Sequence, residues 1–256
     1  MLFPSLSGCA TTGPNYIYAT VDKDPAVHAL GPQARSIPGA VAPGERVLGL
    51  AYDFNTDHLF LRIAPAQVIR VIERPSGKIL REMPLSLDNS PADEVVGTNT
   101  GPAAAGNGAG STNTADLAIR SSDRHLFAVH PDGRSVVELT LFGEVVRRLS
   151  LPSLSEPIGG LAFDQRQLRL LALTGNIVVT FALDGRELSR VTLRAPVRAV
   201  SLGYDSAASH YFVPLADSVT VGEFDSAGRL VATHHVMLAG PITTLDAGPR
   251  SLVRVF

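Results

Sequence analysis

Short apolar runs separated by turns follow one another along most of the chain, and one phrase of this pattern recurs five times. An apolar run ends at a usually acidic residue, five spacer residues follow, and a second apolar run begins, as in 49–53 and 59–61. Runs of this length, bounded by turn residues, predict β-strands. The aligned positions, of which only the second breaks the acidic pattern, are Asp53, Arg120, Asp164, Asp205 and Asp246.

The spacing between copies indicates the repeating unit. Successive aligned positions lie 67, 44, 41 and 41 residues apart. A period near 40 built from short strands predicts the four-stranded blades of a β-propeller. The longer first interval contains residues 87–114, whose small and polar side chains cannot bury apolar area, so we interpret this stretch as a low-complexity loop insertion.

A glycine turn in each full copy completes the blade, and the chain ends must complete the ring. The turns are at Gly77, Gly143, Gly185 and Gly228, where positive φ suits a tight hairpin. The fifth copy holds two strands, the second being 252–256, and an open strand edge invites aggregation. Residues 16–21 and 27–30 are candidate partners for it. We therefore predict an all-β propeller over 16–256, with five four-stranded blades and the last closed by N- and C-terminal strands; six blades are the alternative.

Charge argues against one class of partner. The chain has 22 basic and 24 acidic residues, so it lacks the positive footprint of a nucleic-acid-binding protein. No apolar run reaches the roughly 18 residues needed to cross a bilayer as a helix.

The single cysteine, Cys9, lies in a distinctive context. Leu6-Ser7-Gly8-Cys9 resembles the lipobox of bacterial lipoproteins, and residues 1–15 read as a lipobox with a flexible tether. The resemblance implies acylation of Cys9 and a lipid anchor on the extracytoplasmic side of the cell envelope. Only five residues precede the lipobox, fewer than a secretory signal needs, so we expect the true translation start to lie upstream. The alternative is a fortuitous cysteine in a cytoplasmic protein.

Three histidines, His58, His125 and His210, stand at equivalent places before the second strand of three blades. Blades pack about 10 Å apart, whereas zinc takes ligands at about 2 Å, so these residues are not expected to share a metal ion. We predict that each ties its hairpin to the aligned position of the repeat. Neither a metal nor a cofactor is predicted, and no nucleophile motif gives a catalytic residue.

The loops that connect one blade to the next open on the face where propellers commonly bind ligands. The insertion is one of these loops, and it carries Asp88, Asp93 and Glu94. We take these carboxylates as a candidate ligand face, with solvated loop charge as the alternative.

The repeat is similar to bacterial propellers of the NHL and quinoprotein-like group, in which phrases such as Gly-Leu-Ala-Phe-Asp, found here at 160–164, open a blade. This resemblance implies architecture more than activity. Our leading hypothesis is a non-catalytic, lipid-anchored envelope propeller that binds a protein or glycan partner through its loop-rich face. The alternatives are a propeller-type metal-dependent hydrolase or lactonase and a purely structural scaffold.

Overall fold

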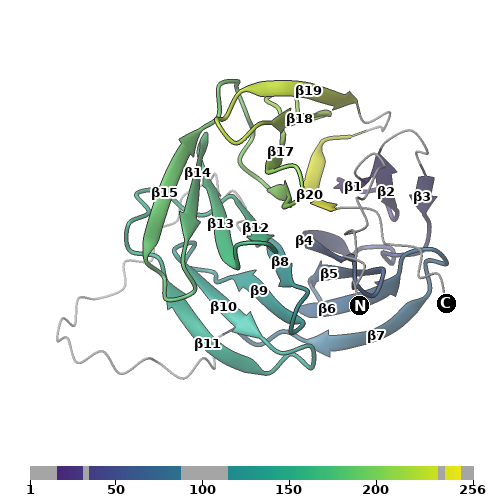
Figure 1. The fold of residues 1–256 in the computed structure, drawn as a ribbon. Helices are drawn as coiled ribbons and strands as arrows, with labels where there is room; N and C mark the ends of the chain where they lie inside the picture. The colour runs from purple at the N-terminus through teal and green to yellow at the C-terminus, as the bar shows by residue number, and fades with distance from the viewer. Residues whose placement is uncertain (1–15, 31–34, 88–114, 236–239, 249–256) are drawn as a thin grey trace, which may run out of the picture.

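The chain forms a ring of five antiparallel sheets, seen along its axis in Figure 1. The computed structural model describes residues 16–30, 35–87, 115–235 and 240–248. The first two blades are β4 (Arg46–Asp53), β5 (His58–Ala64), β6 (Val68–Glu73), β7 (Ile79–Pro84) and β8 (Leu117–Arg120), β9 (His125–Val129), β10 (Ser135–Leu139), β11 (Val145–Ser150). The next two are β12 (Gly160–Asp164), β13 (Arg169–Thr174), β14 (Ile177–Phe181), β15 (Glu187–Thr192) and β16 (Gly203–Asp205), β17 (His210–Pro214), β18 (Thr220–Phe224), β19 (Leu230–His235).

The fifth blade joins the two ends of the chain, as expected from the incomplete last copy. Its order is β20 (Ile242–Gly248), β1 (Tyr16–Val21), β2 (Val27–Leu30) and β3 (Arg35–Ile37), with β20 innermost. β1 pairs antiparallel with β20, from Tyr16 opposite Gly248 to Val21 opposite Ile242. The five-bladed prediction and its closure are confirmed, and the six-bladed alternative is wrong.

The division of the closing blade differs from the prediction in one respect. We expected two strands from the C-terminus, the second being 252–256, and two from the N-terminus. Instead, β1 takes the second place in the blade, and the N-terminal segment supplies a third strand, β3. Among the described residues, β1 is the strand that pairs with β20. Residues 252–256 themselves lie outside the described part of the chain.

Apolar cores lie between neighbouring blades, because each inner sheet region is covered on both faces. Between blades 2 and 3, for example, Phe127 stacks on Phe163 with ring centroids 5.3 Å apart. The inner strands β8 and β12 are accordingly buried along their length, whereas the outermost strands β11 and β19 are largely half exposed or exposed. This arrangement explains why the inner strands read as continuous apolar runs rather than as an alternating pattern.

Glycine is required where the inner strands crowd together. A Cβ atom at Gly49 would lie 2.7 Å from the carbonyl oxygen of Ala115, and one at Gly160 would lie 2.5 Å from the carbonyl carbon of Ser201. Both contacts are with main-chain atoms of the adjacent blade, which cannot move aside cheaply. The ring therefore closes around its axis only because these positions carry no side chain.

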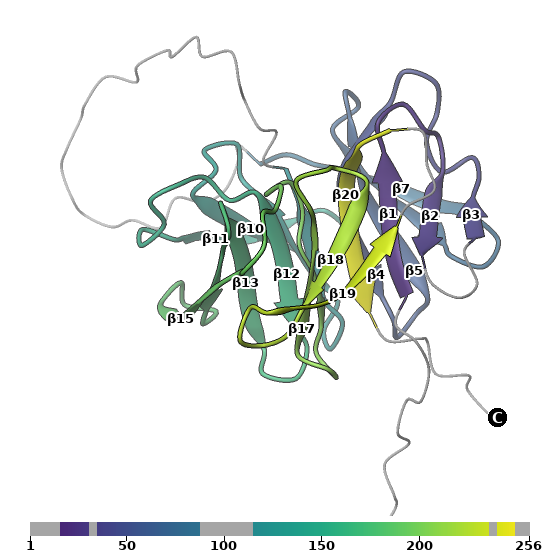
Figure 2. The same cartoon turned by 90° about the horizontal axis from the view of Figure 1, so that it is seen from above.

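The ring has two distinct faces, separated in the side view of Figure 2. We call the loop face the side where the outer strand of one blade connects to the inner strand of the next. We call the hairpin face the opposite side, where first and second strands are joined. Among the described residues, no helix is long and apolar enough to cross a membrane.

Candidate functional site

A cavity of about 640 Å³ opens at the loop face. Its walls are the turn between β1 and β2, the start of β4, and the inter-blade connections that precede β4, β12 and β16. These segments are far apart in sequence and meet only because the ring closes. The cavity is thus a product of the whole fold rather than of any single loop.

An ion-pair network fixes one wall of this cavity. Arg70, which is buried on β6, makes two hydrogen bonds to the carboxylate of Glu45, of 2.7 and 2.9 Å, and a third, of 2.9 Å, to the carbonyl of Ala40. The hydrogen bonds from Arg70 hold the pKa of Glu45 below its ordinary value. Since Arg70 engages the Glu45 carboxylate and the Ala40 carbonyl at once, the connection before β4 is held rigidly against its blade.

Charged side chains of both signs line the cavity. Arg46 and Lys23 are exposed, and Asp22 and Glu156 supply carboxylates. Arg198 is half-buried and donates a hydrogen bond of 3.0 Å to the carbonyl of Ile242. Gly175 leaves room for Glu156, because a Cβ there would lie 3.1 Å from Glu156 Oε2. The arrangement suits a polar ligand that carries both donors and acceptors.

Beneath this cavity, the axis holds a fully buried carboxyl group, that of Asp116. Its Oδ2 accepts hydrogen bonds from the N–H of Leu161 and the hydroxyl of Ser201, both at 2.9 Å, and from the N–H of Leu202 at 3.2 Å. Thr244 Oγ1 donates to Oδ1 at 3.2 Å. Burial raises the pKa of Asp116 to about 7, against the opposing effect of these hydrogen bonds. Asp116 thereby connects blade 2 with blades 3, 4 and 5.

Sequence reasoning missed Asp116, although a signal was present. It stands four residues before the aligned position of its blade, where blades 1 and 3 carry Gly49 and Gly160. A carboxylate in place of an axis glycine indicates a side chain that points into the centre of the ring.

A second residue that sequence reasoning missed is Arg62 on β5. It donates hydrogen bonds to the carbonyls of Val129 and Ala115, and burial lowers the pKa of Arg62 to about 10.

Three of the aligned acidic residues are found at hairpin turns. Asp53 Oδ1 accepts from the N–H of Asn55 at 3.1 Å, Asp164 Oδ1 from that of Arg166 at 2.9 Å, and Asp205 Oδ1 from that of Ala207 at 2.8 Å. Each carboxylate thus closes the turn between the first and second strands of its blade. Asp246 has different partners, considered below.

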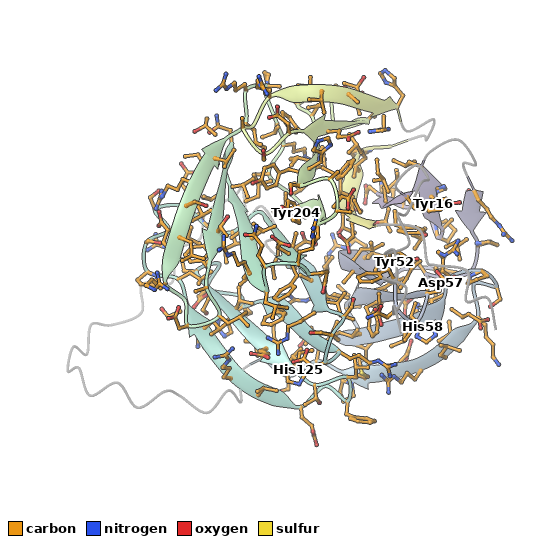
Figure 3. The ribbon with its side chains drawn as sticks, viewed as in Figure 1. Tyr16, Tyr52, Asp57, His58, His125 and Tyr204 are labelled. Carbon is orange, nitrogen blue, oxygen red and sulfur yellow. The ribbon has the colours of Figure 1, made fainter. Side chains whose placement is uncertain are left out.

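Two of the three histidines, His125 and His210, contact a glutamate on the third strand of their blade, a partner that we did not predict. His125 Nδ1 lies 2.6 Å from Glu138 Oε1, and His210 Nδ1 lies 2.6 Å from Glu223 Oε1. In blade 2, His125 also lies 3.1 Å from Arg120, the aligned residue there. Figure 3 shows His58 and His125 in different blades.

Some predicted site residues lie outside the described residues, namely Cys9, Asp88, Asp93 and Glu94. Their roles stay predictions. Within the described ranges, no group of three or more His, Cys, Asp or Glu side chains has the geometry of a metal site.

Comparison with known proteins identifies the fold. No family model and no curated protein sequence matches the chain. A solved structure of a nidogen/laminin complex contains a chain that is 12% identical, with a TM-score of 0.59 over 93% of this chain and 99% of that one. The chain is a five-bladed β-propeller.

Two enzyme structures match the chain at lower similarity. A virginiamycin B lyase from Staphylococcus aureus, solved with quinupristin, is 13% identical with a TM-score of 0.48 over 90% of this chain and 69% of that one. A glutaminyl cyclase from Myxococcus xanthus is 15% identical with a TM-score of 0.47 over 80% and 71%.

Proposed function

We propose that this propeller is a non-catalytic binding module of the cell envelope that holds a protein or glycan partner at its loop face. The cavity of about 640 Å³ carries the proposal, because segments from several blades converge on it and present charges of both signs. Its walls are braced from behind by Arg70 and Glu45, so a partner meets a preformed surface. Preorganisation of this kind lowers the entropic cost of association.

Two further considerations support the proposal. The nidogen chain with the same fold comes from a complex with laminin, an instance of a propeller that has a protein partner. The lipobox-like sequence around Cys9 would tether the ring to a membrane and leave a face free for capture. The insertion with Asp88, Asp93 and Glu94 is an inter-blade connection by its place in the chain and would extend the same face.

Site-specific photo-crosslinking in the native host tests the proposal. A photoreactive residue replaces Leu48, which lines the cavity. In a control protein it replaces Phe142, which is 73% exposed in the turn between β10 and β11, outside the cavity. We expect one dominant crosslinked partner from position 48 and none of that species from position 142. Equal labelling from both positions, or none from position 48, would contradict the assignment of the cavity.

A charge-reversal pair then tests the role of the cavity charges. Arg46→Glu changes an exposed cation within the cavity, whereas Arg186→Glu makes the same change on an outer hairpin where the side chain is 68% exposed. We expect capture of the partner to fall at least tenfold for Arg46→Glu and to be unchanged for Arg186→Glu.

The lipid anchor is tested separately. Mass spectrometry of Cys9 should show acylation in the membrane fraction, and an unmodified cysteine in the soluble fraction would refute the anchor.

A further inference from the structure

A second, smaller cavity lies at the other end of the axis, on the hairpin face. Its volume is about 140 Å³, and all five inner strands or the turns that follow them contribute to its lining. It shares no lining residue with the cavity at the loop face. The proposed partner-binding site therefore does not account for it.

Aromatic rings form much of its wall. Tyr52, Phe54, Phe163 and Tyr204 come from blades 1, 3 and 4. Figure 3 labels Tyr52 and Tyr204 toward the middle of the ring. The hydroxyl of Tyr52 donates a hydrogen bond of 2.9 Å to Asp57 Oδ1, which fixes the orientation of the ring. Gly248 preserves space beside it, because a Cβ there would lie 3.0 Å from Tyr52 Cδ1.

The carboxylate of Asp246 also lines this cavity. In blades 1, 3 and 4 the aligned aspartate closes a hairpin, but β20 has no hairpin to its neighbour, since β1 comes from the other end of the chain. Asp246 instead accepts one N–H on each oxygen, from Ala247 and from Tyr52, both at 2.7 Å. An ionised carboxylate has about four acceptor sites, so two N–H groups leave capacity for a ligand.

The electrostatic surroundings favour a cation. Burial raises the pKa of Asp246 well above its ordinary value, and Asp116 adds to the effect. Asp164 and Asp205 lie close enough to Tyr204 to act on its ionisation. Among the described lining residues the one cation is Arg166, which is exposed and whose Nη1 lies 3.5 Å from the carbonyl of Ala207. A bound cation would supply the counter-charge that Asp246 lacks.

We propose that this cavity binds a small organic ammonium ion, with its N–H groups on Asp246 and its apolar body among the aromatic rings. Aromatic faces attract such cations through their quadrupoles. The volume is comparable to the roughly 150 Å³ of a protein cavity that accepts benzene, so the fit is to one ring or one short alkyl chain. A free amine and the side chain of a lysine on a peptide offer the same chemistry.

Ligand-observed NMR titration of the full chain tests the proposal with three matched probes: benzylammonium, benzyl alcohol and benzoate. We expect saturable binding of benzylammonium below about 10 mM, at least tenfold weaker binding of the alcohol, and none of benzoate. Affinity for the ammonium ion should rise with pH, because burial raises the pKa of Asp246 and the ammonium ion binds its ionised form, whereas affinity for the alcohol should not change with pH. A parallel titration with Nα-acetyl-lysine methylamide shows whether the cavity binds the ammonium group of a lysine in a peptide or only that of a free amine.

Substitutions of lining residues test whether benzylammonium binds in this cavity. Asp246→Asn should weaken benzylammonium binding at least tenfold, whereas Asp184→Asn, at a side chain that is 67% exposed on an outer hairpin, should leave it unchanged. If Asp246→Asn fails to fold by circular dichroism, Tyr204→Leu removes an aromatic wall instead and should weaken binding about fivefold. Equal affinity for the alcohol, tighter binding of benzoate, or full affinity in a folded variant of either lining residue would overturn the proposal.

Discussion

Asp116 and Ser201 are 85 residues apart in the chain and are joined across the axis by a buried hydrogen bond of 2.9 Å. The same carboxyl group accepts N–H groups from the next two blades and the hydroxyl of Thr244 in the closing blade. Asp116 therefore joins four blades at the axis, and its protonation must affect the stability of the whole propeller.

The pH dependence of stability provides the first prediction. The pKa of Asp116 is about 7 in the folded chain and about 3.8 when exposed, so the folded state binds more protons between these values. The contribution of this residue to the free energy of unfolding must then decrease as the pH rises from about 4 to 7, by about 2 to 3 kcal/mol between pH 5 and 8.

Asp116→Asn isolates this effect, because an amide does not titrate in this range. Chemical unfolding at pH 5 and at pH 8 should show that the wild type loses about 2 to 3 kcal/mol more than the variant. The comparison removes the contributions of all other titrating groups. Parallel stability curves for the two proteins would show that Asp116 has no raised pKa.

Ring closure gives the second prediction. Ile17 on β1 is 1% exposed and packs in the core between the closing blade and blade 4. Ile17→Ala should lower the free energy of unfolding by about 2 to 4 kcal/mol, through lost burial and the cavity left behind. Val146→Ala, at a side chain 41% exposed on an outer strand, should cost under about 1 kcal/mol. A loss at Ile17 no larger than that at Val146 would mean that β1 contributes little to closure.

A strained hairpin residue gives the third prediction. Leu168 has φ of 53° and is 46% exposed at the turn between β12 and β13. A left-handed conformation costs a leucine roughly 1 to 2 kcal/mol, and asparagine tolerates it better. Leu168→Asn should raise the free energy of unfolding by about 0.5 to 1 kcal/mol. Leu80→Asn, at a comparably exposed leucine within β7, should not stabilise; equal effects at both positions would refute the role of backbone strain.

The brace behind the loop-face cavity gives the fourth prediction. Arg70→Lys keeps the charge but cannot make the two parallel hydrogen bonds to Glu45. We expect a loss of about 1 to 2 kcal/mol in stability and faster amide exchange in residues 40–46, measured by hydrogen exchange with mass spectrometry. Arg186→Lys serves as the control, since Arg186 and Asp184 are 3.9 Å apart and exposed. Unchanged exchange in 40–46 would show that the brace is unnecessary.

The repeat allowed much of the fold to be predicted from the sequence. Its period gave the five blades, and the incomplete fifth copy gave the closure; the predicted limits of β1 and β2 are those observed. The third N-terminal strand was missed because β3 is only three residues long, with Arg35 and Ser36 exposed. The predicted second C-terminal strand, 252–256, lies outside the described residues, and the repeat pattern did not show that β1 pairs with β20.

The candidate sites were less accessible to sequence reasoning. Asp246 looks like the other aligned aspartates in the sequence, and the place of Asp116 in the repeat does not show its hydrogen-bond partners, which come from distant parts of the chain. At the hairpins between the first and second strands of blades 1 to 4, the left-handed residues are Asp57, Arg124, Leu168 and Ser209, which share no side-chain chemistry. A repeat aligned on apolar and acidic positions therefore shows the framework, while the groups directed into the axis appear only when the ring is assembled.

The register between β1 and β20 also determines how the ring would respond to mechanical force. Tyr16 pairs with Gly248, so β1 enters the sheet at the end where β20 leaves it. A pull that separates these two ends would unzip the ladder one pair at a time. In the tethered arrangement proposed above, with a partner held at the loop face, the load would instead draw β1 lengthwise between β20 and β2, shearing both ladders at once. The closure strand would then resist tension best in the direction in which an anchored receptor is pulled.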